Sequence, residues 1–159
     1  MRSKTKGFTI IEMIIVLAVI SVVSLVTAPL GLQFFNSQTI DGMQSQLGDT
    51  LTRTRSQSVA QKNDSQYGVC LNTSGSSTVS YVLYAGAAGS PCSSHNATTD
   101  EKYALQSGTA ITFPGSSTIP EINFAKHTGT PSATGTISVV WNKLTKTLTI
   151  DSLGTIVEN

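Results

Sequence analysis

Charged side chains are scarce in this chain, because Asp, Glu, Lys and Arg together make up only 12% of its 159 residues. The formal net charge is +1, whereas nucleic-acid-binding domains are usually strongly basic, so the charge does not indicate nucleic-acid binding. Histidine and cysteine each occur twice. A metal site made from Cys70, Cys92 and His95 would have one histidine nearby and no Cys-x-x-Cys pair. We therefore expect no metal and no cofactor.

Motifs of catalysis are also missing. His95 and His127 stand alone among polar residues, and no glycine-rich stretch precedes a Lys-Ser/Thr pair. Serine-rich stretches such as Gly115-Ser116-Ser117 lack the strand, nucleophile and helix order that a hydrolase needs. We expect that the chain is not an enzyme.

A long apolar run, from Phe8 to Leu32, follows a basic leader that carries Arg2, Lys4 and Lys6. As a helix the run would be about 37 Å long, which exceeds a bilayer core of about 30 Å. The leader's positive charge favours a cytoplasmic N-terminus and an exported remainder. The sequence thus predicts a transmembrane helix over 8–32.

Glu12 places a carboxylate inside this apolar run. It could snorkel to the headgroups from one turn inside the helix, or it could need a charged partner. Gly7 offers an unhindered backbone for cleavage, which would leave Phe8 with a free amine. That amine and the carboxylate of a neighbouring subunit would neutralise each other and set the axial register between helices.

An ordinary secretory signal peptide is the alternative for this segment. Its apolar region would be unusually long and would contain Glu12, and the small-residue site at Val26-Thr27-Ala28 precedes Pro29. A proline after the scissile bond should hinder cleavage. Pro29 is better explained as a kink in a long helix, because it removes one backbone hydrogen bond.

Gly7-Phe8-Thr9-Ile10-Ile11-Glu12-Met13, with the apolar residues that follow, resembles the prepilin signal of type IV pilins and type II secretion pseudopilins. The resemblance implies cleavage after Gly7 and N-methylation of Phe8 by a prepilin peptidase. It also implies that Glu12 guides the subunit into a filament. The implied partners are other pilins or pseudopilins and the inner-membrane assembly platform. The implied location is the bacterial inner membrane, single-pass, and then the pilus or pseudopilus.

Beyond the apolar run we expect an α+β fold, in which the helix continues over 33–62 and packs on an antiparallel sheet domain over 63–159. A narrow apolar stripe supports the helix: Ile40, Met43, Leu47, Leu51 and Val59. Asn63-Asp64-Ser65 is its expected stop. Alternating residues and turn signals predict short strands at 67–71, 79–84, 110–113, 121–124, 136–141, 145–150 and 153–157, with a loop at 85–101.

Cys70 and Cys92 both follow the apolar run, so they would lie in a compartment where disulfides persist. A bond between them would close a loop and stabilise the fold by about 3 kcal/mol in the chain-entropy model. We expect this disulfide to be structural.

Two further stretches resemble the GspH/FimT group of minor subunits: 51–62 with Val69-Cys70-Leu71, and 147–154. This resemblance implies a minor pilin or pseudopilin. Some members of the group take part in DNA uptake through arginines that follow the C-terminal glycine, but here Thr155-Ile156-Val157-Glu158 follow Gly154. The alternative function is therefore a tip module that binds DNA or a surface through its Ser/Thr-rich loops or through Arg53, Arg55, Lys62, Lys143 and Lys146.

Mass spectrometry of the mature N-terminus tests the processing site. We expect a chain that begins at Phe8 and carries one additional methyl group. Loss of the leader removes Arg2, Lys4 and Lys6 and leaves seven basic against nine acidic residues, a net charge of −2. A chain that retains Met1, or one that begins at Pro29, would contradict this prediction.

Overall fold

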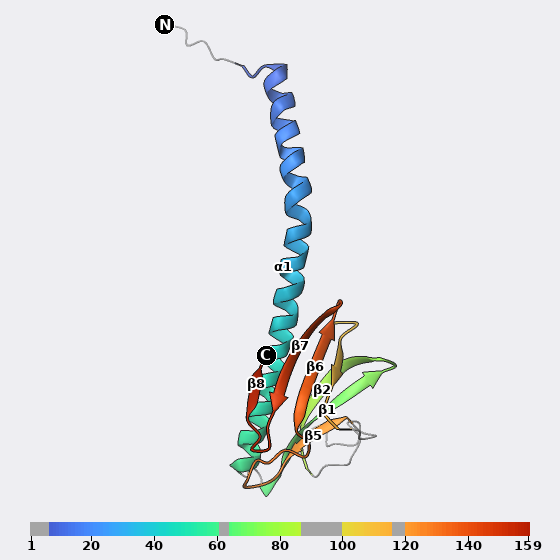
Figure 1. Cartoon of the computed structure of the whole chain (residues 1–159). Helices are drawn as coiled ribbons and strands as arrows, with labels where there is room; N and C mark the ends of the chain where they lie inside the picture. The colour runs from blue at the N-terminus through green and yellow to red at the C-terminus, as the bar shows by residue number, and fades with distance from the viewer. Residues whose placement is uncertain (1–6, 61–63, 87–99, 116–119) are drawn as a thin grey trace. The chain divides into compact units, whose positions relative to one another are not determined.

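The computed structural model describes residues 7–60, 64–86, 100–115 and 120–159 of the chain. It contains a long helix, α1 (Ile10–Val59), which is followed by strands (Figure 1). The chain divides into two compact units, Met1–Ser37 and Gln38–Asn159. The first part of α1 belongs to the former unit, and the part from Gln38 onward belongs to the latter.

Within these described ranges, the strands form two antiparallel sheets of four strands each. The first sheet has the order β3-β2-β1-β5 and comprises β3 (Glu101–Ala104), β2 (Ser77–Ala85), β1 (Tyr67–Ser74) and β5 (Glu121–Phe124). The second has the order β4-β6-β7-β8 and comprises β4 (Ala110–Thr112), β6 (Gly135–Trp141), β7 (Leu144–Ile150) and β8 (Ile156–Glu158). The predicted α+β class and antiparallel pairing are confirmed, but the strands divide between two sheets.

The two predicted hairpins are present. β1 and β2 are joined at Gly75-Ser76, a tighter turn than the five-residue loop expected from the sequence. β6 and β7 turn at Asn142 and Lys143, whose φ angles are 48° and 68°. Two consecutive positive φ values are the geometry of the turn whose twist matches that of antiparallel strands.

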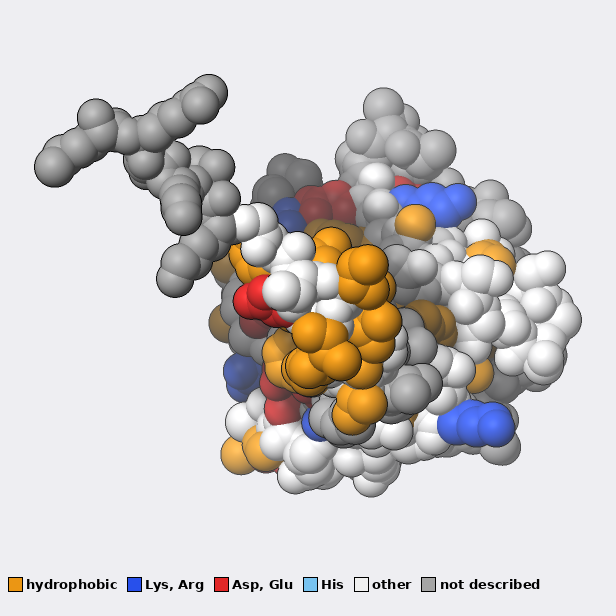
Figure 2. Space-filling model, turned by 90° about the horizontal axis from the view of Figure 1, so that it is seen from above, with side chains coloured by type: hydrophobic (Ala, Val, Ile, Leu, Met, Phe, Trp, Pro, Cys, Tyr) orange, Lys and Arg blue, Asp and Glu red, His pale blue; other side chains and the backbone are white. Residues whose placement is uncertain are grey.

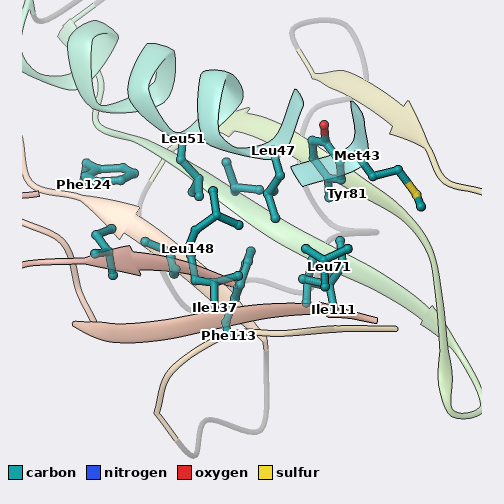
Figure 3. Packing of buried hydrophobic residues seen from close by; sticks show 14 of the residues in the cluster. Met43, Leu47, Leu51, Leu71, Tyr81, Ile111, Phe113, Phe124, Ile137 and Leu148 are labelled. Carbon is teal, nitrogen blue, oxygen red and sulfur yellow. The ribbon is translucent and has the colours of Figure 1, made fainter. Parts of the chain in front are cut away.

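The part of α1 in the second unit packs its apolar stripe over the sheets (Figure 3). Ile40, Leu47 and Leu51 are fully buried and Met43 nearly so. In the close-up, Leu47 and Leu51 point from the helix toward Leu148, which lies on β7. Val59 is different: it is 41% exposed, so its predicted place in the stripe is wrong. The helix ends at this residue, before the expected stop at Asn63-Asp64-Ser65, and 61–63 lie outside the described residues.

Several polar side chains of α1 are buried as well, which the apolar pattern did not predict. The hydroxyl of Thr54 donates to the carbonyl of Thr50 at 2.6 Å, so this buried group is satisfied within the helix. Ser58 uses its hydroxyl oxygen to accept the backbone N–H of Tyr67 at 2.8 Å. This bond ties the last turn of α1 to the start of β1.

The sequence did not predict β3. The loop expected over 85–101 covers its first residue, and no strand was expected over 102–104. β3 pairs antiparallel with β2, and two side-chain contacts add to this pairing: the ring of Tyr103 stacks on that of Tyr81 at 5.0 Å, and Arg53 of α1 forms an ion pair with Glu101. Tyr81 is fully buried, and burial raises its pKa to about 12. All of these partners lie outside the four residues of the strand, so the strand has no strong local sequence signal.

A second, smaller buried cluster comprises Cys70, Val82 and Tyr84. Gly68 makes room for the tyrosine, because a Cβ on this glycine would lie 2.5 Å from the Tyr84 hydroxyl oxygen. The hydroxyl of Tyr84 donates to Glu121 at 2.9 Å and accepts from the side-chain amide of Asn123 at 3.2 Å. These two hydrogen bonds hold the tyrosine side chain in place, so it cannot easily move away from a Cβ added at Gly68.

Gly68→Ala should lower the free energy of unfolding by about 1–3 kcal/mol, the usual cost of overpacking a core. Gly42→Ala is the matched control: it lies in α1, a Cβ there would meet nothing within 4 Å, and the change should stabilise by up to about 1 kcal/mol. Denaturant unfolding followed by fluorescence of Trp141, the single tryptophan, measures both. Equal effects of the two substitutions would contradict the packing described for Gly68.

Candidate functional site

The predicted processing segment lies at the beginning of the described chain. Gly7, Phe8 and Thr9 are not helical, and α1 begins at Ile10. Phe8 is 81% exposed, and a Cβ added to Gly7 would meet nothing within 4 Å. The Gly7–Phe8 peptide bond therefore lies in open, non-helical backbone.

Thr9 caps α1. Its side-chain oxygen accepts the backbone N–H of Glu12 at 3.3 Å, and its carbonyl accepts the N–H of Met13 at 3.3 Å. A threonine followed three residues later by a glutamate is the sequence pattern of a capping box. The pattern Thr9-x-x-Glu12 is therefore the sequence signal of this cap.

Glu12 lies in the first turn of α1, where the positive end of the helix dipole favours a carboxylate. Its side chain is exposed. Among the residues that the structure describes, no hydrogen bond or ion pair engages the carboxylate. The backbone N–H of Glu12 is thus satisfied locally, whereas its carboxylate is exposed and has no partner among the described residues.

Every large apolar side chain described between Phe8 and Val23 is exposed. A space-filling view shows hydrophobic side chains gathered at the surface (Figure 2). Two serines interrupt this segment, and both are satisfied within the helix: Ser21 donates to the carbonyl of Leu17 and Ser24 to that of Ile20, each at 2.8 Å. These hydroxyls can be buried in an apolar environment without leaving an unpaired donor.

The other predicted site residues lie elsewhere. Pro29 is within α1, but its side chain lies outside the described part, so the kink stays a prediction. Cys70 is fully buried in β1, and Cys92 lies outside the described residues, so their bond also stays a prediction. Within the described ranges, no helix is both long enough and apolar enough to span a membrane. The assignment of 8–32 as transmembrane likewise stays a prediction.

Two of the basic residues considered for DNA binding are neutralised by carboxylates, whereas Lys143 is exposed at the turn between β6 and β7. Arg53 is paired with Glu101, and Lys146 is paired with Asp41 at 2.8 Å. Lys62 lies outside the described residues. A cation that is neutralised by a neighbouring carboxylate contributes less to phosphate binding.

Arg55 has a packing role near the C-terminal glycine. A Cβ on Gly154 would lie 2.8 Å from Nε of Arg55 and 2.5 Å from the carbonyl oxygen of Gly129. Gly154 has a φ of 78°, and the adjacent carboxylate of Asp151 accepts the N–H groups of Leu153 and Thr155. The hydrogen bond from the N–H of Thr155 has the largest effect on the pKa of Asp151, and together with the bond from Leu153 it holds that pKa below its usual value. The turn at 151–155 is thus packed against the end of α1.

A small cavity of about 210 Å³ opens beside β4 and β5. Glu121 is the acidic residue of its lining, and its carboxylate already accepts the hydroxyl of Tyr84. In the described part of the chain, no group of three or more His, Cys, Asp and Glu side chains is placed to hold a metal ion. The N-terminal segment therefore remains the candidate site.

Residues 2–28 match the prokaryotic N-terminal methylation motif. The match covers the basic leader, Gly7, Phe8, Thr9 and Glu12, together with most of the apolar run. It supports a type IV pilin-like chain that is a prepilin substrate. No curated protein and no solved structure matches the chain.

The ion pairs on the second unit predict weak DNA binding. In a mobility-shift assay at about 50 mM salt, where phosphate contacts are strong, we expect no retention of duplex DNA by the chain. Glu101→Gln combined with Asp41→Asn frees Arg53 and Lys146 and should increase retention. Salt-dependent binding by the unaltered chain would contradict this prediction and would favour the tip-module alternative.

Proposed function

We propose that this chain is a minor pilin or pseudopilin, a structural subunit of a type IV pilus or a type II secretion pseudopilus. A prepilin peptidase cuts it after Gly7 and methylates the new N-terminus at Phe8. The subunit then joins the filament through α1. The observation that carries the proposal is the carboxylate of Glu12, which has no partner among the described residues of an apolar helix segment whose described serines are bonded within the helix.

The polar groups of that segment support this assignment. Ser21 and Ser24 bond to carbonyls of their own helix, so they need nothing from a neighbouring molecule. Glu12 differs, since its carboxylate has no partner among the described residues. When such helices pack together, this is the polar side chain that has to find a partner in another subunit.

The free-energy cost of burying the Glu12 carboxylate favours its pairing with a terminal amine. An isolated carboxylate at mid-membrane costs about 2.5–3.5 kcal/mol on insertion scales. The amine of Phe8, released by cleavage, is a cation of the right sign at the same end of a neighbouring subunit. A pair that forms only when the two helices are correctly staggered stabilises one axial register.

The membrane holds the subunit before assembly. We place 8–32 across the bacterial inner membrane in a single pass, with the leader in the cytoplasm and the β-rich unit outside. The partners are other pilins or pseudopilins, the prepilin peptidase and the assembly platform. In this role the chain is structural and has no catalytic activity.

The assignment as a minor subunit rests on the resemblance of 51–62, 69–71 and 147–154 to the GspH/FimT group. Two contacts give these stretches structural roles: Ser58 accepts the N–H of Tyr67, and Arg55 packs against Gly154. The end of α1, the start of β1 and the C-terminal turn are thus joined. This junction would hold the β-rich unit firmly on the helix that enters the filament.

Glu12→Gln should leave membrane insertion intact and lower incorporation into filaments by at least tenfold, because the neighbour's amine loses its counter-charge. Ser21→Ala is the matched control: it removes a polar side chain from the same apolar segment, yet its hydroxyl bonds only to its own helix. Membrane fractionation measures insertion, and immunoblotting of sheared filaments measures incorporation. Normal incorporation of the Gln variant would rule out the charge pair.

A further inference from the structure

We propose that Thr9 is a positioning residue for cleavage: by capping α1 it keeps the Gly7–Phe8 peptide bond in non-helical backbone, where a peptidase can bind it. This inference rests on the proposed processing of the chain. It adds a specific role for a residue other than the glycine, the phenylalanine and the glutamate.

The geometry places the start of α1 shortly beyond the scissile bond, with Phe8 and Thr9 between them. Gly7, Phe8 and Thr9 are non-helical, α1 begins at Ile10, and Thr9 bonds to the N–H of Glu12. A capping residue has extended rather than helical backbone angles. The cap therefore ends the helix at Thr9 and leaves Phe8 and Gly7 outside it.

Hydrolysis requires this arrangement. A peptidase must reach both faces of the scissile amide, and within a helix the amide is shielded by adjacent turns and bonded along the axis. Water adds across the Gly7–Phe8 bond, so the carboxylate stays on Gly7 and the amine, with its added proton, is left on Phe8. The 81% exposure of Phe8 agrees with a bond that is open to attack.

The length of the helix that follows Thr9 makes the cap important for the residues before it. A long uninterrupted helical segment follows Thr9, and without a cap such a helix can extend toward its N-terminus. The match of 2–28 to the N-terminal methylation motif supports the proposed modification at Phe8, the residue directly before this cap. The capping residue Thr9 and the proposed modification site Phe8 are thus adjacent in the chain.

The test compares initial rates of leader removal from the detergent-solubilised full-length precursor by membranes that contain a prepilin peptidase. Thr9→Ala removes the capping oxygen and introduces the strongest helix former, so the rate should fall about fivefold, the ratio that a cap of typical strength gives. Thr9→Ser and Thr9→Asn both restore a capping oxygen and should be cleaved at least as fast as wild type.

The asparagine variant separates capping from direct recognition, because it can cap but has no hydroxyl. Slow cleavage of Thr9→Asn, or cleavage of Thr9→Ala at the wild-type rate, would overturn the inference. Amide hydrogen exchange at Phe8 provides a second readout: it should be slower in Thr9→Ala, where the helix extends, and fast in wild type. If the wild-type precursor itself is not cut after Gly7, the proposed function fails, and that result is distinct from a difference between variants.

Discussion

The buried stripe of α1 is the contact on which the β-rich unit depends. Ile40, Leu47 and Leu51 are fully buried, and they join residues of both sheets in one core. Each such side chain contributes about 1.5–3 kcal/mol when it is removed from water. Each sheet alone would leave one apolar face exposed, so the helix that continues from the apolar segment also completes the fold.

A different constraint governs the N-terminal segment, where apolar side chains are exposed rather than buried. Ser21 and Ser24 are satisfied within the helix, and Thr9 caps its first turn. Among the described residues of this segment, Glu12 is the one charged side chain, and it has no partner there. Under the proposed function, this carboxylate would give the association of neighbouring subunits a defined register.

Local patterns predicted much of the fold correctly. Alternating residues placed β1, β2, β6 and β7, and the apolar stripe placed four buried residues of α1. β3 was missed because its stability comes from its pairing with β2 and from contacts with Tyr81 and Arg53, which all lie outside the strand's own sequence. Val59 was assigned wrongly because the buried face of the last helix turns consists of polar residues, Thr54 and Ser58, which an apolar pattern does not reveal.

The candidate site is local, so its residues could be proposed without a structure: Gly7, Phe8 and Glu12 are neighbours in the chain, and their proposed chemistry depends on their spacing in the sequence. The tertiary structure decided the rest. It divided the strands between two sheets, paired Arg53 with Glu101 and Lys146 with Asp41, and placed Arg55 against Gly154. Such contacts join residues that are distant in sequence, and no periodicity encodes which distant surfaces meet.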